Sequence, residues 1–188
     1  MKCAWLVGIA LTCGLLVPGC QPSKPVSEPP AAAKPPAWFE DVTAGSGLDF
    51  IHDSGATGSY FMPESIGSGG ALFDFDNDGR LDIYLVHCAP PGSASKNRLF
   101  QQQPDGRFQD VSAGSGLDVT GFGMGVAAGD ANNDGLPEVL LTEYGAVRFF
   151  LNAGQGKFRD ITQAAGIDNT RWATSAAFFD YDRDGWLD

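Results

Sequence analysis

The apolar residues of this chain fall mostly into short stretches rich in β-branched and aromatic side chains. Leu81 to Val86 and Val147 to Leu151 are two such stretches, and turn-forming residues occur at Pro104-Asp105-Gly106 and at Asn152 to Gly156. The chain also contains 25 Gly and 13 Phe but only 3 Met, a composition that favours strands and tight turns over a helical bundle. The pattern therefore predicts an all-β fold.

The sequence repeats itself, starting each time from a phenylalanine. Phe39 to Asp49, Phe108 to Asp118 and Phe158 to Asp168 align, and their starts lie 69 and 50 residues apart. A second set of aligned segments is acidic and follows the first set. These acidic segments are Ala71 to Asp82, Ala127 to Glu138 and Ala177 to Asp188. The wider first spacing indicates an insertion in the first repeat, at about His52 to Ser65.

Each unit reads as a strand, an acidic loop, a second strand, a turn, a third strand and a turn. Several short strands in a period near 50 residues are typical of a β-propeller blade rather than of a helical solenoid. We therefore predict about two and a half blades over residues 38–188, an incomplete ring. Because the third unit reaches only Asp188, we expect an N-terminal fragment of a longer protein, with an open blade edge available for association.

The N-terminus has the pattern of an export signal. An apolar run from Ala4 to Val17 follows Met1-Lys2 and is shorter than the about 20 residues that a membrane-spanning helix needs, so residues 1–19 are predicted to be a signal peptide. The ending resembles a bacterial lipobox, which predicts lipidation at Cys20. The alternative is ordinary cleavage after Gly19 and secretion. Residues 20–37 are rich in proline and predict a tether, so the protein is expected to be a membrane-anchored lipoprotein facing the periplasm or the cell exterior.

The charge is acidic and concentrated in the acidic segments. The chain has 23 acidic and 12 basic residues, a net charge of −11, which argues against a surface that binds nucleic acid. Eleven of the acidic residues lie in the three acidic segments, so the excess is local. The predicted folded part has a single cysteine, Cys88, which ends an apolar strand and is expected to be a buried, inert thiol.

Within each acidic segment, oxygen-bearing side chains fall at positions 1, 3, 5 and 9, with glycine at position 6. They converge if the backbone curls around one point, which glycine permits because it tolerates φ > 0, and the carbonyl of position 7 completes the shell. Carboxylate and carbonyl oxygens select Ca²⁺ over Zn²⁺ or copper. The predicted ligands are Asp74, Asp76, Asp78, Arg80 and Asp82 in the first loop, Asp130, Asn132, Asp134, Leu136 and Glu138 in the second, and Asp180, Asp182, Asp184, Trp186 and Asp188 in the third.

Other loop types fit less well. An EF-hand or a dockerin loop needs an acid at position 12, where this chain has Leu85 and Leu141, and the flanking segments here are strands. Solvated acidic turns without metal remain the alternative. The middle loop has Asn132 at position 3 and Glu138 at position 9 after Pro137, so its ligands carry one charge fewer and we expect it to bind calcium more weakly.

Several motifs together resemble a known family. Gly70 to Val86, Asn97 to Phe100 and Gly106 to Val111 resemble the FG-GAP/VCBS repeat of integrin-α-like propellers. Phe50 to Ala56, Pro63 to Gly67, Gly123 to Ala128 and Trp172 to Phe179 are similar to the bacterial relatives of cartilage acidic protein, the ASPIC/UnbV family. The resemblance covers about residues 38–188 and implies a calcium-binding propeller, usually of seven blades. The small C-terminal domain that gives that family its name is absent from this sequence.

Two functions are compatible with these features. We favour a non-catalytic module, exported and stabilised by structural calcium, that binds a protein or a polysaccharide through its loops. The alternative is an extracytoplasmic enzyme that uses His52, Asp53, Ser54 and Glu64 of the first-repeat insertion, with His52 as a general base. His87, the other histidine, is expected to be a packed or edge residue. No G-x-S-x-G, H-E-x-x-H or P-loop motif is present in the sequence, which favours the binding module.

Overall fold

The computed structural model describes residues 38–188, and Asp41–Asp188 form one compact unit. The predicted signal peptide (residues 1–19), the lipidation site Cys20 and the tether (residues 20–37) lie outside the described residues. Among residues 38–188, no helix is both long enough and apolar enough to span a bilayer.

The first sheet, called blade 1, is a four-stranded antiparallel meander in the order β1-β2-β4-β5. Its strands are β1 (Gly70–Phe73), β2 (Asp82–Leu85), β4 (Arg98–Gln102) and β5 (Phe108–Asp110). In the hairpin of β1 and β2, Gly70 pairs with Leu85 and Phe73 with Asp82, so the first acidic loop is the turn of this hairpin. The repeat pattern predicted the acidic loop between two strands and a third strand after the next turn, and the structure adds their order in the sheet.

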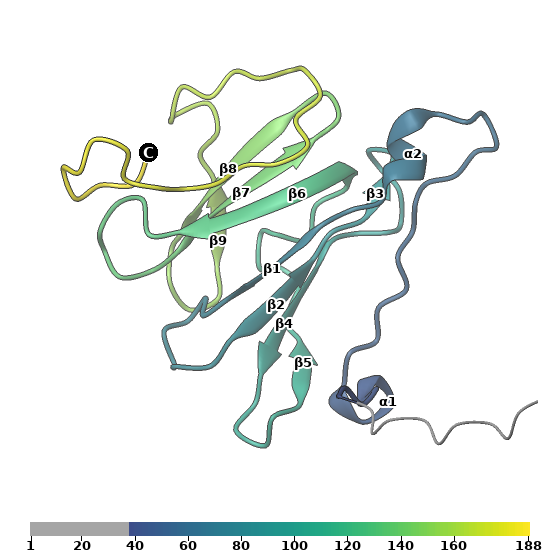
Figure 1. Ribbon diagram of the computed structural model, residues 1–188, viewed down its shortest axis with the longest axis horizontal. Helices are drawn as coiled ribbons and strands as arrows, with labels where there is room; N and C mark the ends of the chain where they lie inside the picture. The colour runs from purple at the N-terminus through teal and green to yellow at the C-terminus, as the bar shows by residue number, and fades with distance from the viewer. Residues whose placement is uncertain (1–37) are drawn as a thin grey trace, which may run out of the picture. The chain divides into compact units, whose positions relative to one another are not determined.

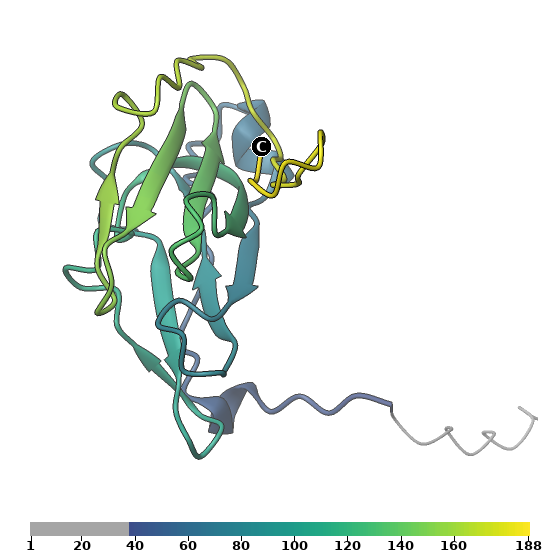
Figure 2. The same ribbon diagram turned by 90° about the vertical axis from the view of Figure 1, so that its left-hand side faces the viewer.

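The second sheet contains blade 2, with strands β6 (Gly121–Gly129), β7 (Glu138–Glu143), β8 (Val147–Asn152) and β9 (Phe158–Asp160). The strand order is β3-β6-β7-β8-β9, because the short β3 (Cys88–Ala89) leaves blade 1 and pairs with the start of β6. Both sheets are antiparallel throughout, which confirms the all-β prediction of propeller blades. The described residues do not close a ring. Figures 1 and 2 show the two groups of strands in blue to teal and in teal to green.

The hydrophobic core lies between the two blades. Alternate residues of blade 1 face blade 2, so Phe73, Tyr84 and Leu99 are buried in one cluster with Val139 and Phe150. Burying this apolar area holds the blades together, at roughly 25 cal/mol per Å² removed from water. Tyr84 is fully buried, and its hydroxyl satisfies its polarity by donating to the carbonyl of Leu117 at 2.9 Å.

The contact between consecutive repeats recurs along the chain. A Cβ on Gly116 would lie 2.1 Å from the carbonyl oxygen of Phe158, and a Cβ on the equivalent Gly47 would lie 2.3 Å from that of Phe108. Both glycines have φ near +85°, at +90° and +83°. The first two repeats therefore each place a left-handed glycine against the last strand of the blade that follows, where no larger residue fits.

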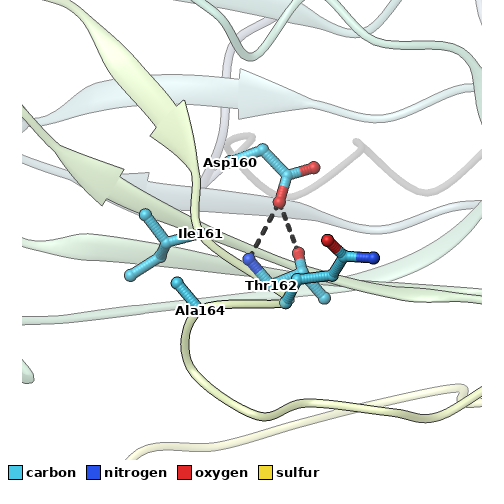
Figure 3. Close-up of a pocket in the computed structure, with 5 residues that line it drawn as sticks. Asp160, Ile161, Thr162 and Ala164 are labelled. Carbon is cyan, nitrogen blue, oxygen red and sulfur yellow. Dashed lines mark hydrogen bonds between the residues drawn. The ribbon is translucent and has the colours of Figure 1, made fainter.

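The third copy of this segment begins with β9, and its glycine does not contact another blade. Gly166 has the same left-handed backbone, with φ +73°, but a Cβ there would meet no atom within 4 Å. The preceding residues line an open depression of about 640 Å³, shown in Figure 3. The carboxylate of Asp160 accepts hydrogen bonds there from the amide and hydroxyl of Thr162, at 2.9 and 2.6 Å.

Three features differ from the predicted pattern. The insertion ends in a short helix, α2 (Met62–Ile66), and the first repeat contains α1 (Thr43–Ser46). The strand expected before the third loop is not formed, because among the described residues its backbone has only the bridge of Trp172 to Tyr144 and the pair of Phe179 with Asp188. A strand needs a hydrogen-bonded partner along its length, and this segment has one only at its ends.

Candidate metal-binding loops

The three acidic loops share one backbone conformation. They lie along the left-hand side of the unit in Figure 1, at the opposite end from α2. The glycine at position 6 has φ +85° in the first loop, +90° in the second and +91° in the third. Position 4 is also left-handed in every loop although it is never glycine; these residues are Asn77, Asn133 and Arg183. Asparagine tolerates this conformation best, a signal at position 4 that the sequence interpretation missed.

The carboxylate at position 1 holds the curl of each loop. In the first loop, Asp74 accepts hydrogen bonds from the amides of Asp78 at 3.0 Å and Gly79 at 2.7 Å. Asp130 and Asp180 accept the equivalent bonds in the other two loops. Because the same two amides are used three times, position 1 has a structural role in addition to its predicted role as a ligand.

Position 9 anchors the far end of each loop to its beginning. Asp82 accepts from the amide of Phe75 at 3.1 Å and, with its other oxygen, from that of Gln102 at 2.8 Å. Glu138 accepts from Ala131 at 2.9 Å, and Asp188 accepts from Tyr181 at 3.1 Å. The longer side chain of Glu138 therefore reaches the same amide as the two aspartates, and Pro137 does not disturb the loop.

Carboxylate oxygens converge in the first and third loops. Ligand atoms of Asp74, Asp76 and Asp78 all lie within 4.8 Å of one another, and those of Asp180, Asp182 and Asp188 do the same. Asp184, the remaining predicted side chain of the third loop, bonds instead to the amide of Trp186 at 2.9 Å. The structure thus brings together most of the predicted side chains in these two loops.

One carboxylate oxygen of the first loop is buried without a partner. Oδ1 of Asp76 makes no hydrogen bond, whereas the other oxygen of Asp76 accepts one from the side-chain amide of Gln101. Burial, followed by the nearby charges of Asp78 and Asp74, raises the pKa of Asp76. A buried carboxylate oxygen costs free energy unless a hydrogen bond or a cation satisfies it. The donor set of the first loop therefore fits a hard cation.

The position 9 carboxyls are the most deeply buried acids of the first two loops. Asp82 and Glu138 are at most 1% exposed, and burial raises the pKa of each above its ordinary value. The other acidic groups of their loops raise both pKa values further. A cation bound nearby would favour the charged forms of these groups.

The middle loop differs at position 3. The side-chain amide of Asn132 donates to Asp134 at 2.9 Å and to Glu138 at 3.4 Å, so it lies between the two carboxylates. Its oxygen accepts from the amide of Asp134 at 2.9 Å. To present that oxygen to a cation, the asparagine side chain must exchange this hydrogen bond for the metal. Asp182 at position 3 of the third loop accepts the same bond from the amide of Asp184, at 3.2 Å, so the two loops differ in the side-chain amide that Asn132 places between the carboxylates.

The position 7 residues contact their loops through the backbone. The amides of Arg80, Leu136 and Trp186 each donate to the position 5 carboxylate, at 2.9 Å in all three loops. Arg80 adds a feature that the ligand pattern did not predict, because its guanidinium pairs with Asp78 and donates to the carbonyl of Gln102 at 2.9 Å. In the first loop, one cationic side chain thus already neutralises part of the acidic cluster.

The insertion of the first repeat forms a second polar site. His52, Ser54 and Glu64 line one pocket of about 610 Å³ with Phe50 and Leu85. Asp53, the fourth predicted residue, bonds instead to the hydroxyl of Ser95 and to the amide of Gly55.

His87 and Cys88 are buried next to this insertion. Nδ1 of His87 accepts from the amide of Asp53 at 2.9 Å, so His87 is a packed residue. Cys88 is fully buried, and burial raises the pKa of its thiol to about 11, as expected for an unreactive cysteine.

The comparisons with known proteins agree with the repeat pattern. The family model of the FG-GAP-like repeat matches residues 74–141 and 130–188. Each match starts at position 1 of an acidic loop, Asp74 or Asp130, and extends through the next acidic loop along the chain. Among curated proteins, no sequence matches the chain significantly.

Proposed function

Because the chain belongs to the FG-GAP-like repeat family, we propose that it is a calcium-stabilised β-propeller module that binds a protein or a polysaccharide through its loops. In this proposal the acidic loops hold structural Ca²⁺, and the ligands are those predicted from the repeat. The protein has no catalytic role in this proposal.

The observation that carries the calcium proposal is the buried oxygen of Asp76. It has no hydrogen-bond partner in a loop where three carboxylates converge within 4.8 Å. A solvated acidic turn without metal would leave this oxygen exposed to water or bonded to an amide. Ca²⁺ accepts six to eight oxygen ligands, so carboxylates at positions 1, 3 and 5 with further oxygens from positions 7 and 9 suit it.

Bound calcium would supply positive charge among groups that otherwise repel one another. The side chains themselves maintain the loop conformation. The carboxylate at position 1 fixes the curl through two backbone amides, and the carboxylate at position 9 joins the end of the loop to its first residues. Because only the folded loop assembles these oxygens, calcium stabilises the folded state by mass action. The loops at this end of the blades are thereby kept rigid for a partner.

The proposal also includes where the protein is located and which group of FG-GAP proteins it belongs to. The apolar run of residues 4–17 and the lipobox-like ending at Cys20 support export and anchoring by an N-terminal lipid, with the Pro-rich residues 20–37 as a tether. The motifs around Phe50 to Ala56 and Trp172 to Phe179 support membership of the ASPIC/UnbV group of FG-GAP proteins.

A thermal melt tests the proposal. We expect the midpoint of unfolding to rise when Ca²⁺ is added and to fall with a chelator, with a much smaller response to Mg²⁺, which requires a more regular octahedral shell. Asp76→Asn should reduce the calcium response without abolishing folding. Asp105→Asn, in an exposed turn outside the loops, is the matched control. A midpoint that does not depend on calcium would exclude structural calcium in these loops.

The pocket in the insertion favours one alternative function. Because His52, Ser54 and Glu64 line the same cavity, an extracytoplasmic enzyme with His52 as general base is the second candidate. A screen of hydrolase and dehydrogenase substrates distinguishes the two. Turnover that is lost in His52→Ala and retained in Asp76→Asn would favour the enzyme over the binding module.

A further inference from the structure

Asn152, the last residue of β8 in blade 2, contacts the first acidic loop from outside that loop. Asn152 is 2% exposed, and its side-chain amide donates to the carbonyl of Phe75 at 2.8 Å. Phe75 occupies position 2 of the first loop, between the predicted ligands Asp74 and Asp76. A buried side chain of the neighbouring blade therefore holds the backbone between two carboxylates.

Phe75 is fixed by its amide, its carbonyl and its ring. The amide donates to Asp82 at position 9 of the same loop, at 3.1 Å. The ring lies 6.4 Å from that of Phe158 and 3.2 Å from the position that a Cβ of Gly156 would take. The bonded carbonyl belongs to the planar peptide unit that joins Phe75 to Asp76. Blade 2 therefore helps to set the direction in which the Asp76 side chain leaves the backbone.

The direction of the Asp76 side chain matters because one of its oxygens is buried without a hydrogen bond. Oδ2 accepts from the side-chain amide of Gln101 on β4, which leaves Oδ1 as the unpartnered oxygen. Asp74 and Asp78 place carboxylate oxygens within 4.8 Å of an oxygen of Asp76. A buried oxygen needs a partner, so a cation among these carboxylates would satisfy it.

The other hydrogen bonds of Asn152 lie within blade 2 and fix its orientation. Its side-chain oxygen accepts from the amide of Gly154 at 3.0 Å, and its backbone amide donates to Glu138 at 3.4 Å. The side-chain amide also donates to the carbonyl of Pro137, at the longer distance of 3.3 Å. Blade 2 thus holds the oxygen of Asn152 and directs the shorter of its two amide bonds to the first loop.

We propose that Asn152 is a positioning residue for calcium in the first loop. By holding the peptide unit before Asp76, it keeps this carboxylate aligned with Asp74 and Asp78, so the site on blade 1 is complete only when blade 2 packs against it. Because calcium affinity depends on the rigidity of the site, loss of this hydrogen bond weakens calcium binding. The inference rests on the proposed function, since it concerns the same calcium.

Calorimetric titration of the full chain with one intact loop tests the proposal. Asp130→Asn and Asp180→Asn together leave a position 1 carboxylate only in the first loop. Adding Asn152→Leu to this one-loop protein should raise the calcium Kd of the first loop by about tenfold, because leucine has a similar size but no amide donor.

Asn97→Leu in the same one-loop protein is the matched control. Asn97 is also 2% exposed, and its side chain bonds to the hydroxyl of Tyr84 and the amide of His87, just before β4 and at the opposite end of that strand from the first loop. This variant also removes a buried amide, but it should leave the calcium Kd unchanged. Circular dichroism establishes that each variant is folded.

A spectroscopic measurement does not require the Asn152→Leu variant to fold. In the one-loop protein, calcium should shift the side-chain amide NMR signal of Asn152 with the calorimetric Kd and leave that of Asn97 in place. An unchanged Kd in folded Asn152→Leu, or an Asn152 signal that calcium does not move, would overturn this proposal alone. A one-loop protein that binds no calcium would overturn the proposed calcium site and this proposal with it.

Discussion

The first and third acidic loops have the same local structure in different surroundings. In both, position 1 accepts from the amides of positions 5 and 6, and position 9 accepts from the amide of position 2. Yet Asp82 at position 9 is fully buried and Asp188 is exposed. The local sequence therefore determines the shape of a loop, and the following blade determines its burial.

The largest expected effect comes from truncating the aromatic residue at position 2. Phe75→Ala should lower the free energy of unfolding by about 3–5 kcal/mol, because it opens a cavity between the blades. Tyr181→Ala should change it by less than about 0.5 kcal/mol, because the side chain is exposed. Denaturant unfolding at low protein concentration measures both. Equal losses would mean that the surroundings of the two loops do not differ energetically.

Glycine substitutions compare a repeat that packs against the next blade with the third repeat, which does not. Gly116→Ala should cost about 2–4 kcal/mol, because its Cβ meets the carbonyl of Phe158 in addition to the strain of a positive φ. Gly166→Ala should cost only the backbone strain, about 1–2 kcal/mol, since its surroundings are open. Thermal melts of the two variants give the difference. A Gly166→Ala variant as unstable as Gly116→Ala would mean that Gly166 is also covered.

The middle loop should have a lower calcium affinity than the other two loops. Variants that keep one loop intact, with position 1 changed to asparagine in the others (Asp74→Asn, Asp130→Asn and Asp180→Asn, two at a time), can be titrated by calorimetry. We expect the middle loop to bind about tenfold more weakly, since it has one carboxylate fewer and Asn132 bonds to its neighbours. A middle site as tight as the others would refute the role of charge count.

The smallest expected effect is the pH dependence from His87. Burial, followed by the proximity of His52, lowers the pKa of His87 below 6.5, while Asp53 opposes and Arg98 adds to the shift. Well above pH 6.5 the group is neutral in both the folded and the unfolded state and contributes nothing to the pH dependence of stability. Below it the unfolded chain takes up a proton first, so stability falls until the lower folded pKa is passed.

Thermal midpoints between pH 5 and 8 in saturating calcium measure this dependence, because His titrates in that range. His87→Asn retains an acceptor for the amide of Asp53 and should remove this part of the pH dependence. His52→Asn should reduce this part of the pH dependence without removing it, because His52 contributes to the shift only after burial. Identical profiles for wild type and His87→Asn would contradict the assignment.

The sequence predicted what depends on residues close together in the chain. The strands, their hairpins and the convergence of acidic side chains, at positions 1, 3 and 5 in the first loop and 1, 3 and 9 in the third, follow from the alternation of apolar residues and from Asp, Asn and Gly spacing. It did not predict the pair of β3 with β6 or the unpartnered oxygen of Asp76, because both depend on packing across distant segments. The missing strand before the third loop has the same cause, since strand pairing is not encoded in one segment alone.

The side chain of Asn133 at position 4 of the middle loop donates to the carbonyl of Gly185 in the third loop at 3.1 Å. Position 4 and position 6 are the two left-handed residues that define each curl. A hydrogen bond that joins them therefore makes the order of one loop depend on the order of the next. We therefore expect these two loops to be coupled, so that an event that rigidifies one of them favours the ordered form of the other by the same free energy.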